Sequence, residues 1–376
     1  MDAGRLIATI LRHDKKVTSY KLALIRSIND LVLGYPHIAQ NCTAVAIPLK
    51  RLAQFWVAYY WPFVAQEQPI RQGQFIKGKQ DISFRLALTQ TRQEWEKIVG
   101  ASKSSDGFYL ETELRSENRR RSYPISLIEA HERAVDAMVD ALQQPIRYAG
   151  PGEYSVFPRP QSWRKLQNVL GIVCLPGTEP ADTCVLLEKE IWQGFCDLSL
   201  WIEALCIHEW CQLTHQLIGI NQGIIYGLLT DRPGNRRPLT WERNNVEILM
   251  MEGNQFECPW TGKKLHPSNY DIDHLLPINV YPLNELWNLV PSDRDFNQHK
   301  KRDRMPGHEH LLLAQPRLVR TYQNYINSQA LSPVLLKDAG ERFPQLAGEN
   351  NVPLKLADAV VSYLDTVSLS RNIAVF

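Results

Sequence analysis

The sequence predicts a mainly α fold with one small α+β region late in the chain. Apolar residues recur at helical spacing through most of the 376 residues, and strand-like alternation is clearest near residues 270–276. Hydrophobic residues make up 44% of the chain and charged residues 22%, a balance typical of a globular protein. The length of 376 residues is enough for two or three domains. We expect a helical N-terminal region (1–238), a small α+β domain (239–312) and a helical C-terminal segment (313–376).

The N-terminal region is expected to begin with helices over residues 3–66, one of which starts at Pro48. Further helices are expected at 81–98 and 126–143, with a strand at 108–114 between them. The helix after Pro48 carries an aromatic stripe that could stack on bases but is more often part of a core. The stripe consists of Phe55, Trp56, Tyr59, Tyr60 and Trp61.

Two clusters in this region could bind a ligand. Arg115 and the run 119–121 are either a solvated loop or a contact to a DNA backbone. An apolar helical stretch at 181–217 carries ligand-type residues on one face, which could bind zinc, although a buried apolar face is the simpler interpretation. These residues are His208, Cys211 and His215.

A linker rich in Pro, Gly and Arg at 230–238 precedes the α+β domain. The domain is expected to begin with a helix at 239–252, followed by a strand at 255–258 that pairs with the strand at 270–276. Ser292 or Asp293 then caps a helix that runs to about Arg302. Two helices, at 308–328 and 352–369, are expected after it.

Four residues in this domain follow a known pattern. Asp273 and His274 stand together at a strand end, Asn288 follows His274 by 14 residues, and Asn297 follows Asn288 by nine. The types, order and spacing resemble the HNH (ββα-metal) endonuclease family, in the His-Asn-Asn variant found in the HNH domain of RNA-guided CRISPR nucleases. The resemblance covers about residues 256–306. It implies a ββα-metal nuclease domain.

The same residues suit hydrolysis of a phosphodiester. Asp273 and the amide oxygen of Asn297 are ligands of the type that Mg²⁺ or Mn²⁺ prefers, and His274 is a suitable general base for water. Neighbouring strand residues point to opposite faces, so a bulge or strand end is needed to bring Asp273 and His274 to one phosphate. By resemblance, Asn288 would hydrogen-bond the loop backbone and hold the His274 segment.

Some assignments have alternatives. Asp271 is the alternative metal ligand, and His299 is the alternative third residue of the motif. The basic residues at the end of the expected helix are either phosphate contacts or a solvated helix end. They are Lys300, Lys301 and Arg302.

One feature departs from many HNH proteins, which hold a structural zinc with two Cys-x-x-Cys pairs. Here only Cys258 remains of the first pair, and no cysteine follows it. We therefore expect no structural zinc. Four apolar residues are expected to pack in its place: Trp260, Leu265, Trp287 and Phe296.

The predicted function is metal-dependent cleavage of nucleic acid, DNA rather than RNA, in restriction or anti-phage defence. A protein partner or guide complex is also possible, because the net charge is only +2 and gives no general attraction to DNA. The alternative is a nucleic-acid-binding or scaffold protein with an inactive HNH fold. Seven cysteines without framework spacing suggest a cytoplasmic protein, and no apolar run is long enough for a membrane span.

Overall fold

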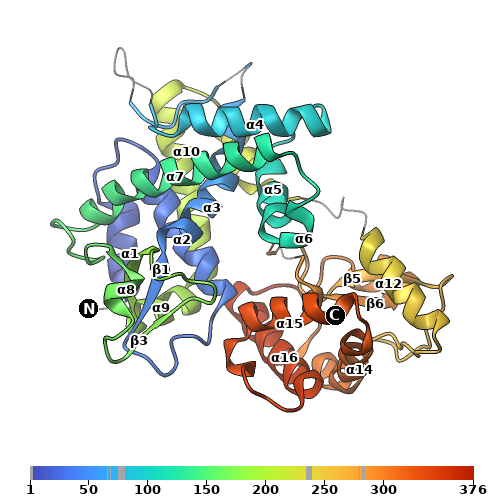
Figure 1. Ribbon diagram of the computed structural model, residues 1–376. Helices are drawn as coiled ribbons and strands as arrows, with labels where there is room; N and C mark the ends of the chain where they lie inside the picture. Colours follow the sequence, from blue (N-terminus) through green and yellow to red (C-terminus); the bar gives the residue numbers. More distant parts are fainter. Residues whose placement is uncertain are drawn as a thin grey trace. The chain divides into compact units, whose positions relative to one another are not determined.

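The computed structural model divides the chain into two compact units, Met1–Pro233 and Gly234–Phe376 (Figure 1). It describes residues 3–65, 67, 69–74, 81–233, 239–278, 280–281 and 284–376, with only the backbone of Asn118. Helices dominate both units and the strands form two small sheets, so the predicted mainly α class with a small α+β part is confirmed. Residues 234–238 of the predicted linker lie outside the described residues.

No helix in the described part of the chain combines the length and the apolar character that a membrane span requires.

The core of the first unit forms around helix α2 (Tyr20–Gly34), in which every residue except Lys21 is buried. Helix α2 packs against α3 (Leu49–Tyr60), α7 (Ile125–Tyr148) and α10 (Ser199–Ile218). The aromatic stripe of α3 belongs to this core: its rings contact one another and the ring of Trp210, with Tyr60 and Trp210 5.2 Å apart. The stripe is therefore a packing feature and not a surface for bases.

A four-stranded sheet lies within the first unit, in the order β2-β4-β1-β3. The sequence predicted only helices over two of these strands, because a short run of apolar residues fits a buried strand and a buried helix equally well. This correction applies to β1, inside 3–66, and to β4, inside 181–217. The strands are β1 (Ala44–Pro48), β2 (Gln161–Ser162), β3 (Ile172–Cys174) and β4 (Thr183–Glu188).

The expected strand at 108–114 is also wrong, because these residues form helix α5 (Asp106–Arg115). Its apolar residues Leu110 and Leu114 are four positions apart and both are buried. This spacing fits one face of a helix, and the same segment also fits the alternation of a strand. The other helices of this unit are α1 (Ala3–Arg12), α4 (Arg85–Val99), α6 (Glu117–Arg120), α8 (Trp163–Leu166), α9 (Lys189–Asp197) and α11 (Gln222–Thr230).

The second unit contains an antiparallel pair of strands, β5 (Tyr270–His274) and β6 (Leu289–Asp293). The register runs from Tyr270 opposite Asp293 to His274 opposite Leu289. The expected partner of β5, residues 255–258, does not pair with it, because that segment folds back on itself in a turn closed by a bridge between Glu257 and Lys264. The partner strand is instead the segment that follows the loop.

A short helical segment follows β6 and consists of α13 (Arg294–Phe296) and a π-helical turn, η3 (Asn297–Lys301). Of the two predicted caps, Asp293 is the one used: its Oδ1 accepts a hydrogen bond from the backbone N–H of Phe296 at 2.9 Å. Burial opposes the charge of this carboxyl, but the Phe296 N–H and Lys263 hold the pKa of Asp293 below its ordinary value.

Four longer helices complete the described part of the second unit, and two of them, α14 (His308–Asn327) and α15 (Leu331–Arg342), make hydrogen bonds to β6 or to the segment that precedes it. The hydroxyl of Tyr322 donates to the carbonyl of Trp287 at 2.7 Å, and that of Tyr325 donates to the carbonyl of Leu289 at 2.9 Å. The guanidinium of Arg342 donates to the carboxylate of Glu285 at 2.9 Å. The other two of these helices are α12 (Thr240–Met251) and α16 (Val352–Arg371).

These contacts predict how much chain the α+β part needs in order to fold. A fragment of residues 239–315 ends inside α14 and lacks Tyr322, Tyr325 and Arg342, whereas a fragment of 239–376 keeps all three. We expect the longer fragment to unfold cooperatively in urea and the shorter one to show no cooperative transition, as measured by circular dichroism. A cooperative transition of the shorter fragment at the same midpoint would show that α14–α16 are dispensable.

Candidate active site

Asp273 occupies the next-to-last position of β5, and its two carboxylate oxygens have different surroundings. Oδ1 accepts a hydrogen bond from the ammonium of Lys301 at 3.1 Å. Oδ2 is buried and has no hydrogen-bond partner among the described residues. The residue is only 6% exposed, and an unpartnered carboxylate oxygen in such a place is unfavourable unless a cation or a donor joins it.

His274 ends the same strand and points to the other side of it. The ladder is regular at this point, with Asp273 opposite Val290 and His274 opposite Leu289. A bulge or a strand end was expected here, to bring Asp273 and His274 to one phosphate. The regular ladder shows no bulge, and β5 ends at His274. The imidazole is 4% exposed, so little of its ring is accessible to solvent.

One hydrogen-bond partner of His274 is Asn284, a residue that the sequence did not assign to the site. The imidazole Nε2 lies 2.8 Å from the amide oxygen of Asn284. Because an amide oxygen only accepts, this contact favours the tautomer with the proton on Nε2, in which Nδ1 is the basic nitrogen. No spacing rule identified Asn284, since it lies in an irregular loop.

Asn288 makes the loop hydrogen bonds that the resemblance implies. Its Oδ1 accepts from the backbone N–H of Leu276 at 2.7 Å, and its Nδ2 donates to the carbonyl of the same residue at 3.2 Å. The backbone carbonyl of Asn288 also accepts from the N–H of Leu275 at 2.8 Å. The segment that follows His274 is thereby joined to the residue that precedes β6.

Asn297 is the first residue of η3 and is partly exposed. Its side-chain amide makes no hydrogen bond within the described part of the chain, so its oxygen is available to a ligand. Lys301, the last residue of the same turn, contacts Asp273. The turn that carries Asn297 is therefore anchored beside the Asp273 carboxylate.

The alternatives to these two residues have other roles in the structure. Both oxygens of Asp271 are occupied, because Oδ1 accepts from Arg294 Nε at 3.0 Å and Oδ2 accepts from Gln298 at 3.2 Å. His299 is exposed, and its Nδ1 lies 3.1 Å from the carboxylate of Asp295. Asp271 thus fastens the helical segment to the strand, and His299 is a surface residue.

The three basic residues after Asn297 are separated by the structure. Lys300 and Arg302 are exposed, as phosphate contacts would need to be. Lys301 is only 1% exposed and directs its ammonium to Asp273. Its expected role as a contact to the DNA backbone is therefore corrected.

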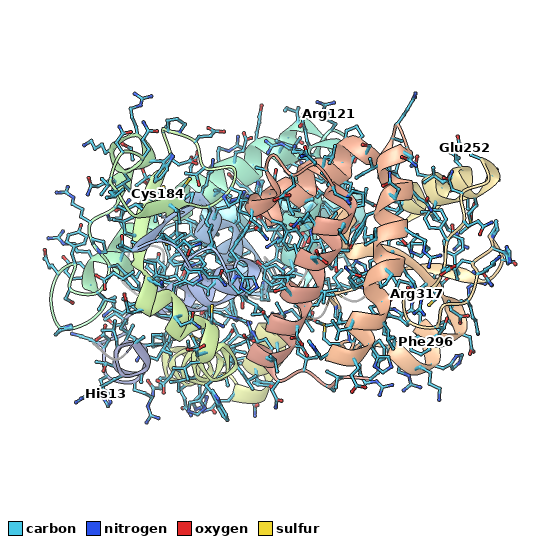
Figure 2. All side chains as sticks on the ribbon, turned by 90° about the horizontal axis from the view of Figure 1, so that it is seen from below. His13, Arg121, Cys184, Glu252, Phe296 and Arg317 are labelled. Carbon is cyan, nitrogen blue, oxygen red and sulfur yellow. The ribbon has the colours of Figure 1, made fainter. Side chains whose placement is uncertain are left out.

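The segment that carries zinc-binding cysteines in many HNH proteins is here a tight turn at Cys258–Gly262, with the Gly262 N–H donating to the Cys258 carbonyl at 2.9 Å. Arg317 of α14 covers this turn and donates to the carbonyl of Pro259 at 2.7 Å. Figure 2 labels Arg317 and Phe296 in this unit.

The four apolar residues expected in place of zinc divide into different groups. Trp260 and Phe296 both contact the ring of Phe376, at 5.6 Å and 5.5 Å between centroids. Trp287 packs elsewhere, against Phe343 and Tyr363. The expectation of a single cluster is therefore only partly correct.

The ligand candidates of the first unit do not assemble. Within the described residues no three side chains of the His, Cys, Asp or Glu type come together as a metal site, and His208 and His215 are exposed whereas Cys211 is buried. The arginine run is engaged in ion pairs that reduce its attraction for phosphate. The pairs are Arg119 with Glu113, Arg120 with Glu132, and Arg121 with Glu117.

The hydrogen bonds of Asn288 predict a local effect of its removal. Asn288→Ala leaves the buried N–H and carbonyl of Leu276 without their side-chain partners, at a cost of about 1–3 kcal/mol for each group. We expect faster deuterium exchange at Leu275 and Leu276 in the full-length protein, measured by mass spectrometry. Asn245→Ala, at a partly exposed position of α12, is the control and leaves this exchange unchanged. Equal exchange in the two variants would contradict the prediction.

Comparison with known proteins gives two matches to family models. The model described as HNH endonuclease matches residues 258–307, and a model described as a domain of unknown function (DUF8808) matches residues 1–229. No curated protein and no solved structure matches the chain. The HNH segment indicates nuclease activity on nucleic acid, and such nucleases generally use divalent metal ions. Since the second model spans more than half of the 376 residues, the chain belongs to the DUF8808 family and carries an HNH endonuclease segment after that domain.

Proposed function

We propose that this protein is a metal-dependent HNH endonuclease that hydrolyses phosphodiester bonds of DNA. The observation that carries the proposal is the state of Asp273: one oxygen is paired with Lys301 and the other, Oδ2, is buried without a partner among the described residues. His274 is the adjacent residue, and Asn297 is on the turn that contacts Asp273. This combination of groups suits phosphodiester hydrolysis.

The donor set suits Mg²⁺ or Mn²⁺. Oδ2 of Asp273 and the amide oxygen of Asn297 are hard oxygen ligands, and two protein ligands leave positions for water and phosphate oxygens. A divalent cation at this place would supply charge neutralisation on the phosphate and on the leaving oxygen. The expectation that the domain needs no structural zinc remains a prediction, and the Arg317 contact to the Cys258–Gly262 turn supports it.

His274 acts as the general base in this proposal. The amide oxygen of Asn284 accepts a hydrogen bond from Nε2–H and so orients the ring, and in this proposal Nδ1 takes a proton from the attacking water. The hydroxide oxygen forms a bond to phosphorus as the bond to the 3′ oxygen breaks. The products carry a 5′-phosphate and a 3′-hydroxyl.

Asn288 contributes by holding the loop after His274, so that the base and Asp273 keep their places at the end of β5. Lys300 and Arg302 are exposed next to this site and make no ion pair within the described residues. We assign them to the phosphates that flank the scissile bond. Such contacts orient the substrate without reading its sequence.

The DUF8808 domain supplies recognition or regulation in this proposal, because the contacts of an HNH site position phosphates and do not specify bases. A net charge of +2 favours recognition through local contacts, a protein partner or a guide complex. We propose a restriction or anti-phage defence role in the cytoplasm. Seven free cysteines agree with a reducing compartment.

A second candidate is a nucleic-acid-binding protein with an inactive HNH fold. The observation that favours it is the burial of both Asp273 and His274, which limits the access of a phosphate. Cleavage of nucleic acid by the purified protein separates the two candidates.

The test uses the purified full-length protein with supercoiled plasmid and Mg²⁺ or Mn²⁺, with EDTA as the metal-free control. Removal of a general base costs about 10²- to 10⁴-fold in rate, so His274→Ala is expected to cleave at a small fraction of the wild-type rate. Asn297→Ala is expected to recover partly as the metal concentration rises. His299→Ala, at an exposed position of the same turn, is the matched control and keeps the wild-type rate.

Two results would contradict the proposal. One is cleavage by His274→Ala at the wild-type rate, and the other is cleavage that persists in EDTA. An absence of cleavage on duplex DNA, single-stranded DNA and RNA with either metal would favour the inactive fold.

A further inference from the structure

Lys301 is a buried cation that the proposed mechanism does not use directly. Its ammonium donates to Asp273 Oδ1 at 3.1 Å and to the backbone carbonyl of His274 at 2.8 Å. Burying an ammonium is unfavourable unless it is paired and hydrogen-bonded, and both conditions are met here. One side chain therefore contacts the metal-ligand residue and the general-base residue of the proposed site.

The contact makes the two oxygens of Asp273 inequivalent. A free carboxylate can offer either oxygen, or both, to a cation. With Oδ1 held by Lys301, only Oδ2 remains without a partner within the described residues. The pairing thus fixes the orientation of the carboxylate.

The buried Lys301 lies at the end of a π-helical turn and is followed by a residue with a positive φ. Lys301 ends the π-helical turn η3, in which the N–H of Arg302 bonds the carbonyl of Asn297 at 2.9 Å. Arg302 then has a φ of +49°, a conformation that non-glycine residues rarely adopt. Such turns are frequent at functional sites, and strained backbone residues cluster there. Lys301 is buried, and its neighbours Lys300 and Arg302 remain on the surface.

We propose that Lys301 is a positioning residue that restricts Asp273 to a single oxygen, Oδ2, for the divalent cation. The inference rests on the proposed metal-dependent nuclease function and adds a consequence to it. The ammonium is a positive charge close to the bound cation, so it weakens cation binding while it fixes the place where the cation is held. Lys301 thereby lowers the affinity for the metal and defines the position at which the metal binds.

The test measures Mn²⁺ binding and DNA cleavage separately in the full-length protein. Mn²⁺ binding is followed by the electron paramagnetic resonance signal of the free ion. We expect Lys301→Met to bind Mn²⁺ more tightly, on the order of tenfold, because a nearby positive charge is removed and both oxygens of Asp273 become available. We expect the cleavage rate at saturating Mn²⁺ to fall at least about tenfold, because the cation is no longer held in one place.

Lys301→Gln separates charge from hydrogen bonding and serves where the methionine variant folds poorly. The glutamine amide can still donate to Asp273 Oδ1 or to the His274 carbonyl. We therefore expect Lys301→Gln to bind Mn²⁺ more tightly than the wild type and to lose less cleavage than Lys301→Met. Lys355→Met removes an exposed charge from α16 of the same unit and is the control. Its Mn²⁺ affinity should stay within about twofold of the wild type, since exposed charges are screened by solvent.

The outcomes distinguish this inference from the proposed function. Wild-type binding of Mn²⁺ that is unchanged in Asp273→Ala would overturn the metal site itself. Binding that depends on Asp273 but is equal or weaker in both Lys301 variants would overturn the role of Lys301 alone. A purely structural lysine would lower stability without raising the affinity for Mn²⁺.

Discussion

The hydrogen bonds between the Asn288 side chain and the backbone of Leu276 are the constraint on which the arrangement of the site depends. Strands β5 and β6 are joined by a loop, and the ladder ends at the pair His274 and Leu289. Beyond that pair, the chain after His274 is joined to the start of β6 by the backbone hydrogen bond from the Leu275 N–H to the Asn288 carbonyl and by the side chain of Asn288. The amide of Asn288 bonds both the N–H and the carbonyl of Leu276, so the loop begins from a fixed point. His274 and the neighbouring Asp273 are held in position by this connection.

Charge is distributed unequally between two carboxylates that stand two residues apart on β5. Asp271 has both oxygens occupied, by Arg294 and Gln298, and is thereby committed to holding the helical segment on the strand. Asp273 has one oxygen committed to Lys301 and one without a partner among the described residues. The chemistry of the two residues is the same, and their partners alone separate a structural role from a proposed metal-binding role.

The sequence allowed the fold class and the HNH segment to be predicted, because helical periodicity and the Asp-His, Asn, Asn spacing are local features. Elements whose identity depends on distant partners were not predictable. The apolar run at 44–48 reads equally as helix or strand until its neighbours β3 and β4 are known. The predicted partner of β5 was residues 255–258, which lie closer to it in the chain than its observed partner, β6.

The candidate site divides in the same way. Asp273, His274, Asn288 and Asn297 could be proposed as site residues because a family pattern specifies their spacing. Asn284 and the burial of Lys301 could not, since each depends on how an irregular loop or a π-helical turn directs one side chain. A charged triplet at a helix end gives no sign of which member is buried, and only the packing of η3 against β5 distinguishes Lys301 from Lys300 and Arg302.

The central claim is that Asp273 presents Oδ2 to a divalent cation while Lys301 holds Oδ1. Anomalous diffraction from crystals grown with Mn²⁺ tests it most directly. We expect one anomalous peak, at about 2.1 Å from Asp273 Oδ2 and close to the amide oxygen of Asn297, with the Lys301 ammonium still on Oδ1. A peak bound by both oxygens of Asp273 with Lys301 displaced, or a peak at Asp271 instead, would contradict it.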